Sequence, residues 1–147
     1  MNEQWKNRYY DLAGEVATWS KDPSKKVGAI IVGKHGQVIS QGYNGFPRGM
    51  DDDPKYYDDR EKKYERVVHA EANAIYNATR NGVSLDGSTM FVYGLPICHE
   101  CAKAIIQVGI SEVVMKWEEI PYKWQRSSIL AEKFFDESKV KRTYLAP

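Results

Sequence analysis

The chain has 147 residues, of which 42% are hydrophobic and 28% charged, and this places it among ordinary soluble globular proteins as a single domain over residues 1–147. Its 21 basic and 20 acidic residues leave a net charge of +1, so no bulk charge attracts nucleic acid or a membrane, and a small-molecule substrate is favoured. The sequence has no apolar run of membrane-spanning length, no secretory signal and only two cysteines, so we expect a cytoplasmic protein, in the host cytoplasm if the source is a virus.

The first half of the chain predicts a helix, a hairpin and a long loop. Residues 2–19 have helical periodicity, ended by Asp22-Pro23, with an expected buried stripe of Trp5, Tyr9, Leu12, Val16 and Trp19. Residues 27–32 and 37–40, joined by a turn at 33–36, are predicted to be the strands of a hairpin. Residues 42–59 are rich in glycine and proline and predict a long loop, whose acidic run 51–53 we interpret as a solvated face rather than a metal site.

The second half alternates between helical and strand patterns. A short exposed helix is expected at 56–66, then helices at 69–80, 98–108 and 125–135 alternate with strands at 89–93, 112–116 and 140–145. The apolar face of helix 69–80 is expected to hold Ala72, Ile75, Tyr76 and Thr79. Right-handed crossovers make the last three strands parallel. The predicted fold is therefore a three-layer α/β/α domain with a five-stranded mixed sheet, in which the hairpin joins three parallel strands.

His69, Cys98 and Cys101 are the candidate ligands of one zinc ion. Zinc binds His nitrogen and Cys sulfur tetrahedrally, and a catalytic site leaves its fourth position for water. Cys98 and Cys101 at i and i+3 lie on the same side of a helical turn, and a helix N-terminus lowers thiol pKa values. Glu71 is the candidate proton carrier. It borders the same cavity as His69 only if both stand where the chain enters the helix, so the structure has to meet this condition.

Each motif has other interpretations when taken alone. His-Ala-Glu is short enough to arise by chance, and Cys-x-x-Cys also occurs in redox pairs and zinc ribbons. Both motifs here begin apolar helical segments, so we favour a catalytic zinc. Together they resemble the signature of zinc nucleobase deaminases, in which the Glu is a general acid and base rather than a ligand. The chain departs from that signature at Ile97, which separates Pro96 from Cys98 and leaves the path of the loop open.

Nearly the whole chain resembles the deoxycytidylate (dCMP) deaminase family of the cytidine deaminase-like superfamily. Residues 20–29 (SKDPSKKVGA) and 42–49 (GYNGFPRG) are similar to stretches typical of that family, and the second is the more discriminating. The resemblance implies zinc-dependent hydrolysis of dCMP to dUMP and ammonia, which supplies dUMP for thymidylate synthesis. A zinc-bound water has a pKa of about 7. Glu71 would accept its proton, protonate ring N3 and then protonate the departing ammonia.

The resemblance also suggests the substrate contacts. Asn44 matches the family's loop residue, and its amide can both donate and accept. A nucleotide substrate further requires cations or amides for one phosphate, and Lys26 is the preferred contact. The expected substrate-binding residues are Asn44, Ala70, Ser24, Lys26, Tyr122 and Arg126.

Many members of this family are hexamers that dCTP activates and dTTP inhibits, with Mg²⁺ accompanying the triphosphate. The resemblance implies the same here, with the effector held at a subunit boundary by Gly45, Phe46, Arg48 and Arg80. Three alternatives stay open: a deaminase of another cytosine nucleotide or nucleoside, a deaminase of RNA or single-stranded DNA, and a zinc-stabilised interaction module without chemistry.

Overall fold

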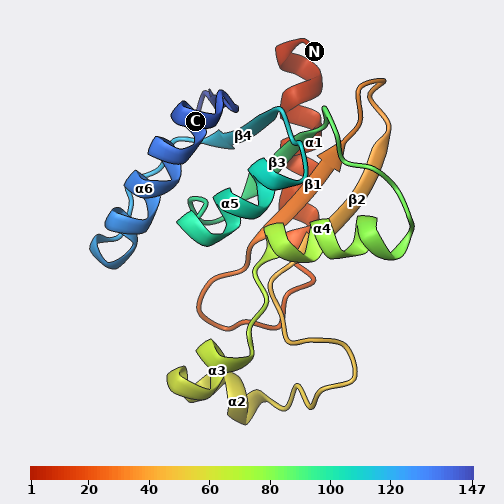
Figure 1. Ribbon diagram of the computed structural model, residues 1–147. Coiled ribbons are helices and arrows are strands. Elements are labelled where there is room, and N and C mark those ends of the chain that lie inside the picture. Colours follow the sequence, from red (N-terminus) through yellow and green to blue (C-terminus); the bar gives the residue numbers. More distant parts are fainter.

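A five-stranded mixed sheet in the order β2-β1-β3-β4-β5 forms the middle layer of the computed structural model, which describes residues 1–147 (Figure 1). The strands are β1 (Gly28–Val32), β2 (Val38–Tyr43), β3 (Thr89–Tyr93), β4 (Glu112–Lys116) and β5 (Lys141–Leu145). β1 pairs antiparallel with β2 and with β3, whereas β3, β4 and β5 are parallel. The predicted mixed sheet, with its hairpin and three parallel strands, is confirmed.

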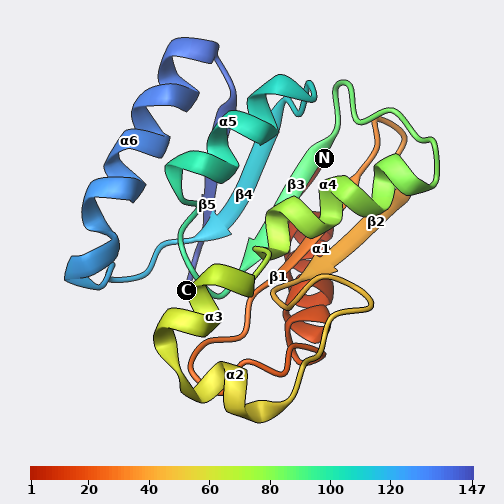
Figure 2. The same ribbon diagram turned by 60° about the horizontal axis from the view of Figure 1, so that its bottom comes forward.

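Helices cover both faces of this sheet. α1 (Glu3–Ala17) lies on one face, and α4 (Ala70–Arg80), α5 (His99–Gln107) and α6 (Tyr122–Ser138) lie on the other (Figures 1 and 2). The short helices α2 (Pro54–Asp58) and α3 (Arg60–Arg66) stand beyond one end of the sheet. None of these helices is both long and apolar enough to cross a membrane.

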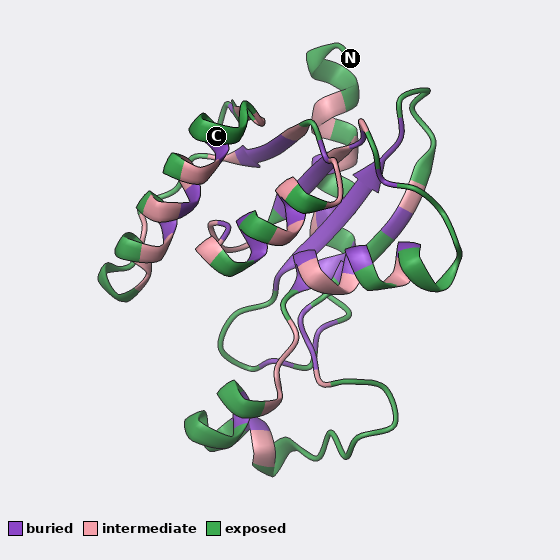
Figure 3. Ribbon diagram, viewed as in Figure 1, coloured by how far each residue is buried: buried purple, intermediate pink, exposed green.

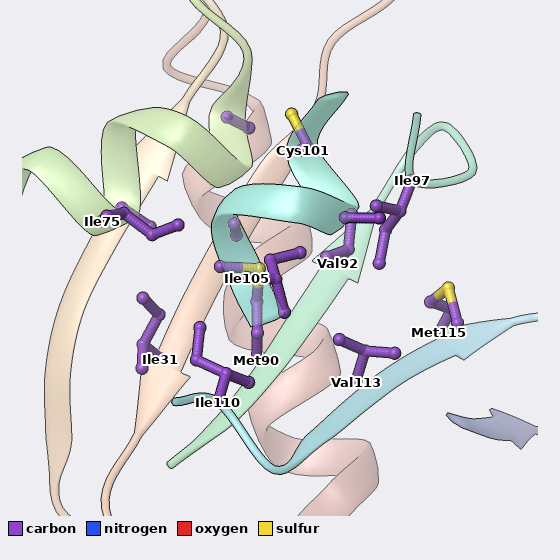
Figure 4. Close-up of a cluster of buried hydrophobic side chains, with 14 of the residues drawn as sticks. Ile31, Ile75, Met90, Val92, Ile97, Cys101, Ile105, Ile110, Val113 and Met115 are labelled. Carbon is purple, nitrogen blue, oxygen red and sulfur yellow. The ribbon is translucent and has the colours of Figure 1, made fainter. Parts of the chain in front are cut away.

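The sheet has a hydrophobic cluster on each face. The larger cluster joins strand residues such as Ile31, Met90 and Val113 to Ile105 of α5 (Figure 4). Phe135 of α6 belongs to the same cluster. The smaller cluster joins the other side of the same strands to α1. All five residues of β1 are buried, because both of its faces are covered (Figure 3). The sheet is therefore a rigid platform for the loops at its ends.

The predicted buried stripe of the first helix is wrong for three of its five members, because Trp5, Leu12 and Trp19 are exposed. α1 buries Ala13 and Ala17 beside Tyr10 and Val16 instead. A side-chain Cβ at Gly28 would lie 2.0 Å from the Ala13 carbonyl oxygen. The helix therefore approaches the sheet most closely at its small residues. A prediction based on the spacing of large apolar side chains does not detect these positions.

α4 shows the same effect. Tyr76 and Thr79 are exposed, contrary to the prediction, and the buried face carries Ala70, Ala74 and Ala78 with Ile75. At Gly42 of β2 an added Cβ would meet the backbone of α4 at 2.3 Å. Alanines on the helix and a glycine on the strand therefore bring the start of α4 tightly against the sheet.

The expected helix at 56–66 is instead two helices, α2 and α3, separated at Asp59, and α2 begins at Pro54 inside the predicted loop. Acidic side chains cap both starts: Asp53 accepts the Lys55 amide, and Asp59 accepts the amides of Glu61 and Lys62. One member of the acidic run thus has a local structural role.

Candidate functional site

The three candidate zinc ligands converge at two helix starts. His69 is the N-cap residue of α4, Cys98 is that of α5, and Cys101 lies in the first turn of α5. His69 Nδ1 is 3.5 Å from Cys98 Sγ and 3.4 Å from Cys101 Sγ, and the three atoms lie within 4.8 Å of one another. Zinc with ordinary bond lengths holds a tetrahedral nitrogen and sulfur about 3.6 Å apart. The donor set therefore fits a zinc ion by both chemistry and spacing.

The extra residue Ile97 does not disturb this arrangement. Its side chain is 3% exposed and belongs to the larger core cluster. Cys98 follows in extended conformation and its sulfur accepts the Cys101 amide at 3.3 Å. The Ser127 hydroxyl of α6 accepts the amide of His99 at 3.0 Å. The core on one side and α6 on the other thus hold the start of α5 in place.

The local electrostatics suit a metal centre and a proton carrier. Hydrogen bonding from Cys101 and His69 outweighs burial and lowers the pKa of the Cys98 thiol to about 4. The same hydrogen bond to Cys98, together with burial, raises the pKa of the Cys101 thiol, so without metal the pair shares one proton and Cys98 is the thiolate. Glu71 is 4% exposed, and burial raises the pKa of its carboxyl above the usual range. A carboxyl with a raised pKa can both accept and return a proton near neutral pH.

A cavity of about 470 Å³ opens where α4 and α5 begin. His69, Glu71 and Cys98 line it, so the condition that His69 and Glu71 border one cavity is met. Residues 20–27, α3 and the start of α6 come to the same end of the sheet (Figure 2) and complete the walls. Four cationic side chains line these walls: Lys25, Arg60, Lys63 and Lys123. The cavity thus joins the metal triad to a cationic region.

The structure brings half of the expected substrate contacts to the cavity. Ser24, Asn44 and Ala70 line it. Lys26, Tyr122 and Arg126 do not, and Tyr122 is 89% exposed. The sequence neighbours Lys25 and Lys123 line the cavity instead. Spacing along the chain located these basic segments but not which of two adjacent side chains points inward.

Asn44 is tied into the loop in front of β1. Its Nδ2 group donates to the Lys25 carbonyl at 2.9 Å and to Asp22 Oδ2 at 3.3 Å, and its Oδ1 accepts the Val27 amide at 2.9 Å. Both amide N–H groups therefore have partners within the protein, and only a second lone pair on Oδ1 remains for a ligand.

Sequence reasoning missed a buried ion pair in the cavity wall. Lys63 Nζ lies 2.9 Å from Asp22 Oδ1, and both side chains are almost fully buried. In the sequence, Asp22 marked only the end of the first helix, because a proline follows it. Lys63 lies in a strongly charged stretch that predicted an exposed helix. No local signal separates Lys63 from its exposed neighbours.

The candidate effector residues lie outside the cavity lining. Gly45 forms a backbone bridge with Val68, and Phe46 stacks on Tyr57 with ring centroids 4.1 Å apart. Arg48 donates to Asn77 of α4 at 2.8 Å. Arg80 follows Asn77 by three residues, so both arginines lie along the exposed side of α4.

Comparisons with known proteins agree with this geometry. The model of the cytidine and deoxycytidylate deaminase zinc-binding region matches residues 3–117. An uncharacterised deaminase from the luxG 3′ region of Aliivibrio fischeri is 39% identical over 147 residues, which cover 99% of this chain and 96% of that protein. The human deoxycytidylate deaminase is 40% identical over 116 residues, or 76% of this chain and 64% of the human protein. The chain thus spans just under two thirds of the human enzyme.

A solved structure is similar over almost the whole chain. The dCMP deaminase of cyanophage S-TIM5, crystallised in complex with dCMP and dUMP, superposes with a TM-score of 0.77 at 25% identity. The superposition covers 98% of each chain.

Proposed function

The chain belongs to the cytidine and deoxycytidylate deaminase zinc-binding family, and on that premise we propose that it hydrolyses dCMP to dUMP and ammonia. The observation that carries this proposal is a single cavity whose walls hold Glu71, two members of the metal triad (His69 and Cys98) and four cations. Such a cavity suits a substrate with a base to deaminate and a phosphate to bind. Relatives named deoxycytidylate deaminase and the phage complex with dCMP and dUMP support the same substrate.

In the proposed reaction, His69, Cys98 and Cys101 hold the zinc. When bound, zinc supplies a Lewis acid that lowers the pKa of water to about 7. Glu71 takes a proton from the attacking water and delivers it to ring N3 of cytosine. A new C4–O bond forms, the C4–N bond breaks, and Glu71 carries the second proton to the departing ammonia. Its burial keeps this carboxyl away from bulk water during both transfers.

We propose that Lys25, Arg60 and Lys123 bind the phosphate, in place of Lys26, Tyr122 and Arg126, which were expected from the sequence. Asp22 compensates the charge of Lys63. The other carboxylate that lines the cavity is Glu71, so the remaining three cations are available to a ligand. Arg60 donates to the Tyr64 hydroxyl at 3.4 Å. Burial raises the pKa of Tyr64, but Lys123 and Arg60 lower it by more, which places both cations close to one hydroxyl. A phosphate dianion fits this group of donors.

We further propose that the protein is a cytoplasmic hexamer, activated by dCTP and inhibited by dTTP with Mg²⁺. Neither cysteine is part of a disulfide, which suits a reducing compartment. The cavity has cations for one phosphate, so a triphosphate requires a second site, and Arg48 and Arg80 on the exposed side of α4 offer one beside Gly45 and Phe46. Asn44 lies in the same segment as Arg48 and lines the cavity. Effector binding at this segment would therefore reach the substrate site.

Ammonia release from dCMP, dCTP, deoxycytidine, cytosine and a cytosine-containing oligonucleotide, measured in parallel, tests the substrate. We expect the highest kcat/KM for dCMP. Equal turnover of deoxycytidine contradicts the monophosphate assignment, and preferred turnover of the oligonucleotide favours a nucleic-acid deaminase.

Titration of dCMP with and without each triphosphate tests the regulation. A coupling of about 1–3 kcal/mol corresponds to a 5- to 150-fold change in dCMP affinity. Arg48→Ala should reduce the effect of the triphosphates on dCMP affinity, whereas Arg8→Ala on the opposite face of the sheet should not. Wild-type kinetics that ignore both triphosphates would refute the regulation and leave the catalytic proposal intact.

A further inference from the structure

Ser127 joins α6 to the metal-binding end of α5. The two helices lie side by side (Figures 1 and 2). The Ser127 hydroxyl accepts the backbone amide of His99 at 3.0 Å, and its oxygen lies 2.8 Å from Nδ1 of the same residue. A hydroxyl can accept one hydrogen bond and donate its own proton in another, so one side chain binds His99 twice. His99 directly follows Cys98, so both bonds are made beside a zinc ligand.

The residues of α6 that precede Ser127 reach the catalytic cavity. Lys123 and Trp124 line it, and the Lys123 ammonium lies 5.1 Å from the centre of the Trp124 ring. Lys123 comes four residues before Ser127, so both lie on the same side of the helix, one turn apart. The first turn of α6 has little support of its own, because its N-cap residue Pro121 forms no side-chain capping bond and Tyr122 is 89% exposed. The position of Lys123 therefore depends on the contact that Ser127 makes one turn later.

We propose that Ser127 is a positioning residue for dCMP, because its bonds to His99 fix the distance between the metal triad and Lys123. This inference rests on the proposed function, in which the base of the substrate binds at the triad and Lys123 binds its phosphate. The two ends of one nucleotide thus contact two different helices, and Ser127 joins those helices. Ser127 is not among the residues that line the cavity, so it acts through Lys123 rather than on the substrate.

Loss of the Ser127 hydroxyl should weaken the binding of dCMP without affecting a substrate that has no phosphate. A hydrogen bond to a charged group changes affinity by about 10- to 100-fold, so Lys123→Ala should raise KM for dCMP by about tenfold or more. Ser127→Ala displaces this cation instead of removing it, so we expect a smaller rise of about three- to tenfold. The kcat/KM for deoxycytidine should keep its wild-type value in both variants. Ser127→Thr keeps the hydroxyl and should therefore keep the wild-type KM for dCMP.

The experiment is a double-mutant cycle on KM for dCMP with wild type, Ser127→Ala, Lys123→Ala and the double variant. Because Ser127 acts through Lys123, its loss should raise KM no further once Lys123 is replaced. The control Ser138→Ala makes the same change at the exposed far end of α6 and should behave like wild type. Zinc content by mass spectrometry should stay full in every variant, since all three ligands are retained. His99→Phe removes Nδ1 from the other side of the contact, should raise KM for dCMP in the same way, and serves if Ser127→Ala fails to fold.

Three outcomes would overturn the inference: an unchanged KM for dCMP in Ser127→Ala, equal losses on dCMP and deoxycytidine, or effects of the two substitutions that multiply in the double variant. Equal losses would mean that Ser127 only supports the fold, and multiplying effects would mean that it acts without Lys123. If the wild type does not deaminate dCMP at all, the proposed function fails instead. Calorimetric titration with dCMP and deoxycytidine then tests the inference, because Ser127→Ala should weaken the binding of dCMP alone. Equal weakening of both ligands, or of neither, refutes it.

Discussion

Replacing Asn44 by alanine should lower the stability of the protein as well as its deaminase activity. The side chain is 7% exposed and forms three hydrogen bonds, to the Val27 amide, the Lys25 carbonyl and Asp22. The Val27 amide would lose its acceptor within a buried backbone, which costs about 1–3 kcal/mol. The other two partners border the cavity and can regain water, so each adds about 0.5 kcal/mol. We expect a total loss of about 2–4 kcal/mol of unfolding free energy.

Urea unfolding followed by tryptophan fluorescence measures this loss. A loss of this size is a large part of the roughly 5–15 kcal/mol typical of a domain, and it should lower the Tm by about 4–16 °C for a chain of this length. Asn44→Asp should be worse than alanine, because it places a second carboxylate beside Asp22. The control is Asn7→Ala on α1, where a surface change should stay within about 0.5 kcal/mol.

The reasoning would be refuted by an Asn44→Ala variant that unfolds like the wild type but has a much lower kcat/KM. That result would mean that the amide serves the substrate alone and that the hydrogen bonds to residues 22–27 contribute nothing measurable.

The remaining predictions concern the site and the core. Glu71→Gln should lower kcat by about 10²- to 10⁴-fold with full zinc content by mass spectrometry, and surviving activity would remove Glu71 from the mechanism. Cys98→Ser should lose zinc and lower the Tm, because metal binding is coupled to folding, so a fully loaded variant would show that the ligands are misassigned. Arg60→Ala should raise KM for dCMP about tenfold and leave deoxycytidine unchanged, whereas equal losses would argue against a phosphate contact. Phe135→Ala should cost about 3–5 kcal/mol in urea unfolding, since Phe135 is 1% exposed.

Local patterns in the sequence were sufficient for the metal triad and for the order of the elements, except that α2 and α3 were predicted as one helix. Two strands were predicted with the bounds that the structure has, 89–93 and 112–116, and the starts of α4 and α5 lie one residue after the predicted starts. Periodicity, capping and an i, i+3 pair of cysteines depend on residues close together in the chain. α6 is longer than predicted at both ends, from Tyr122 to Ser138, because its polar and aromatic end residues carry no periodic signal.

Only the tertiary structure decided which side chains are buried and which line the cavity. Ala13 and Ala74 lie where the helix backbones come closest to the sheet, because close packing of a helix on a strand selects small side chains. Lys63 is buried because it meets Asp22, which lies 41 residues earlier in the chain. A lysine is stable there only with its partner in place. No sequence pattern near Lys63 indicates that Asp22 is its partner. The position of Lys63 in the cavity wall therefore depends on the tertiary structure.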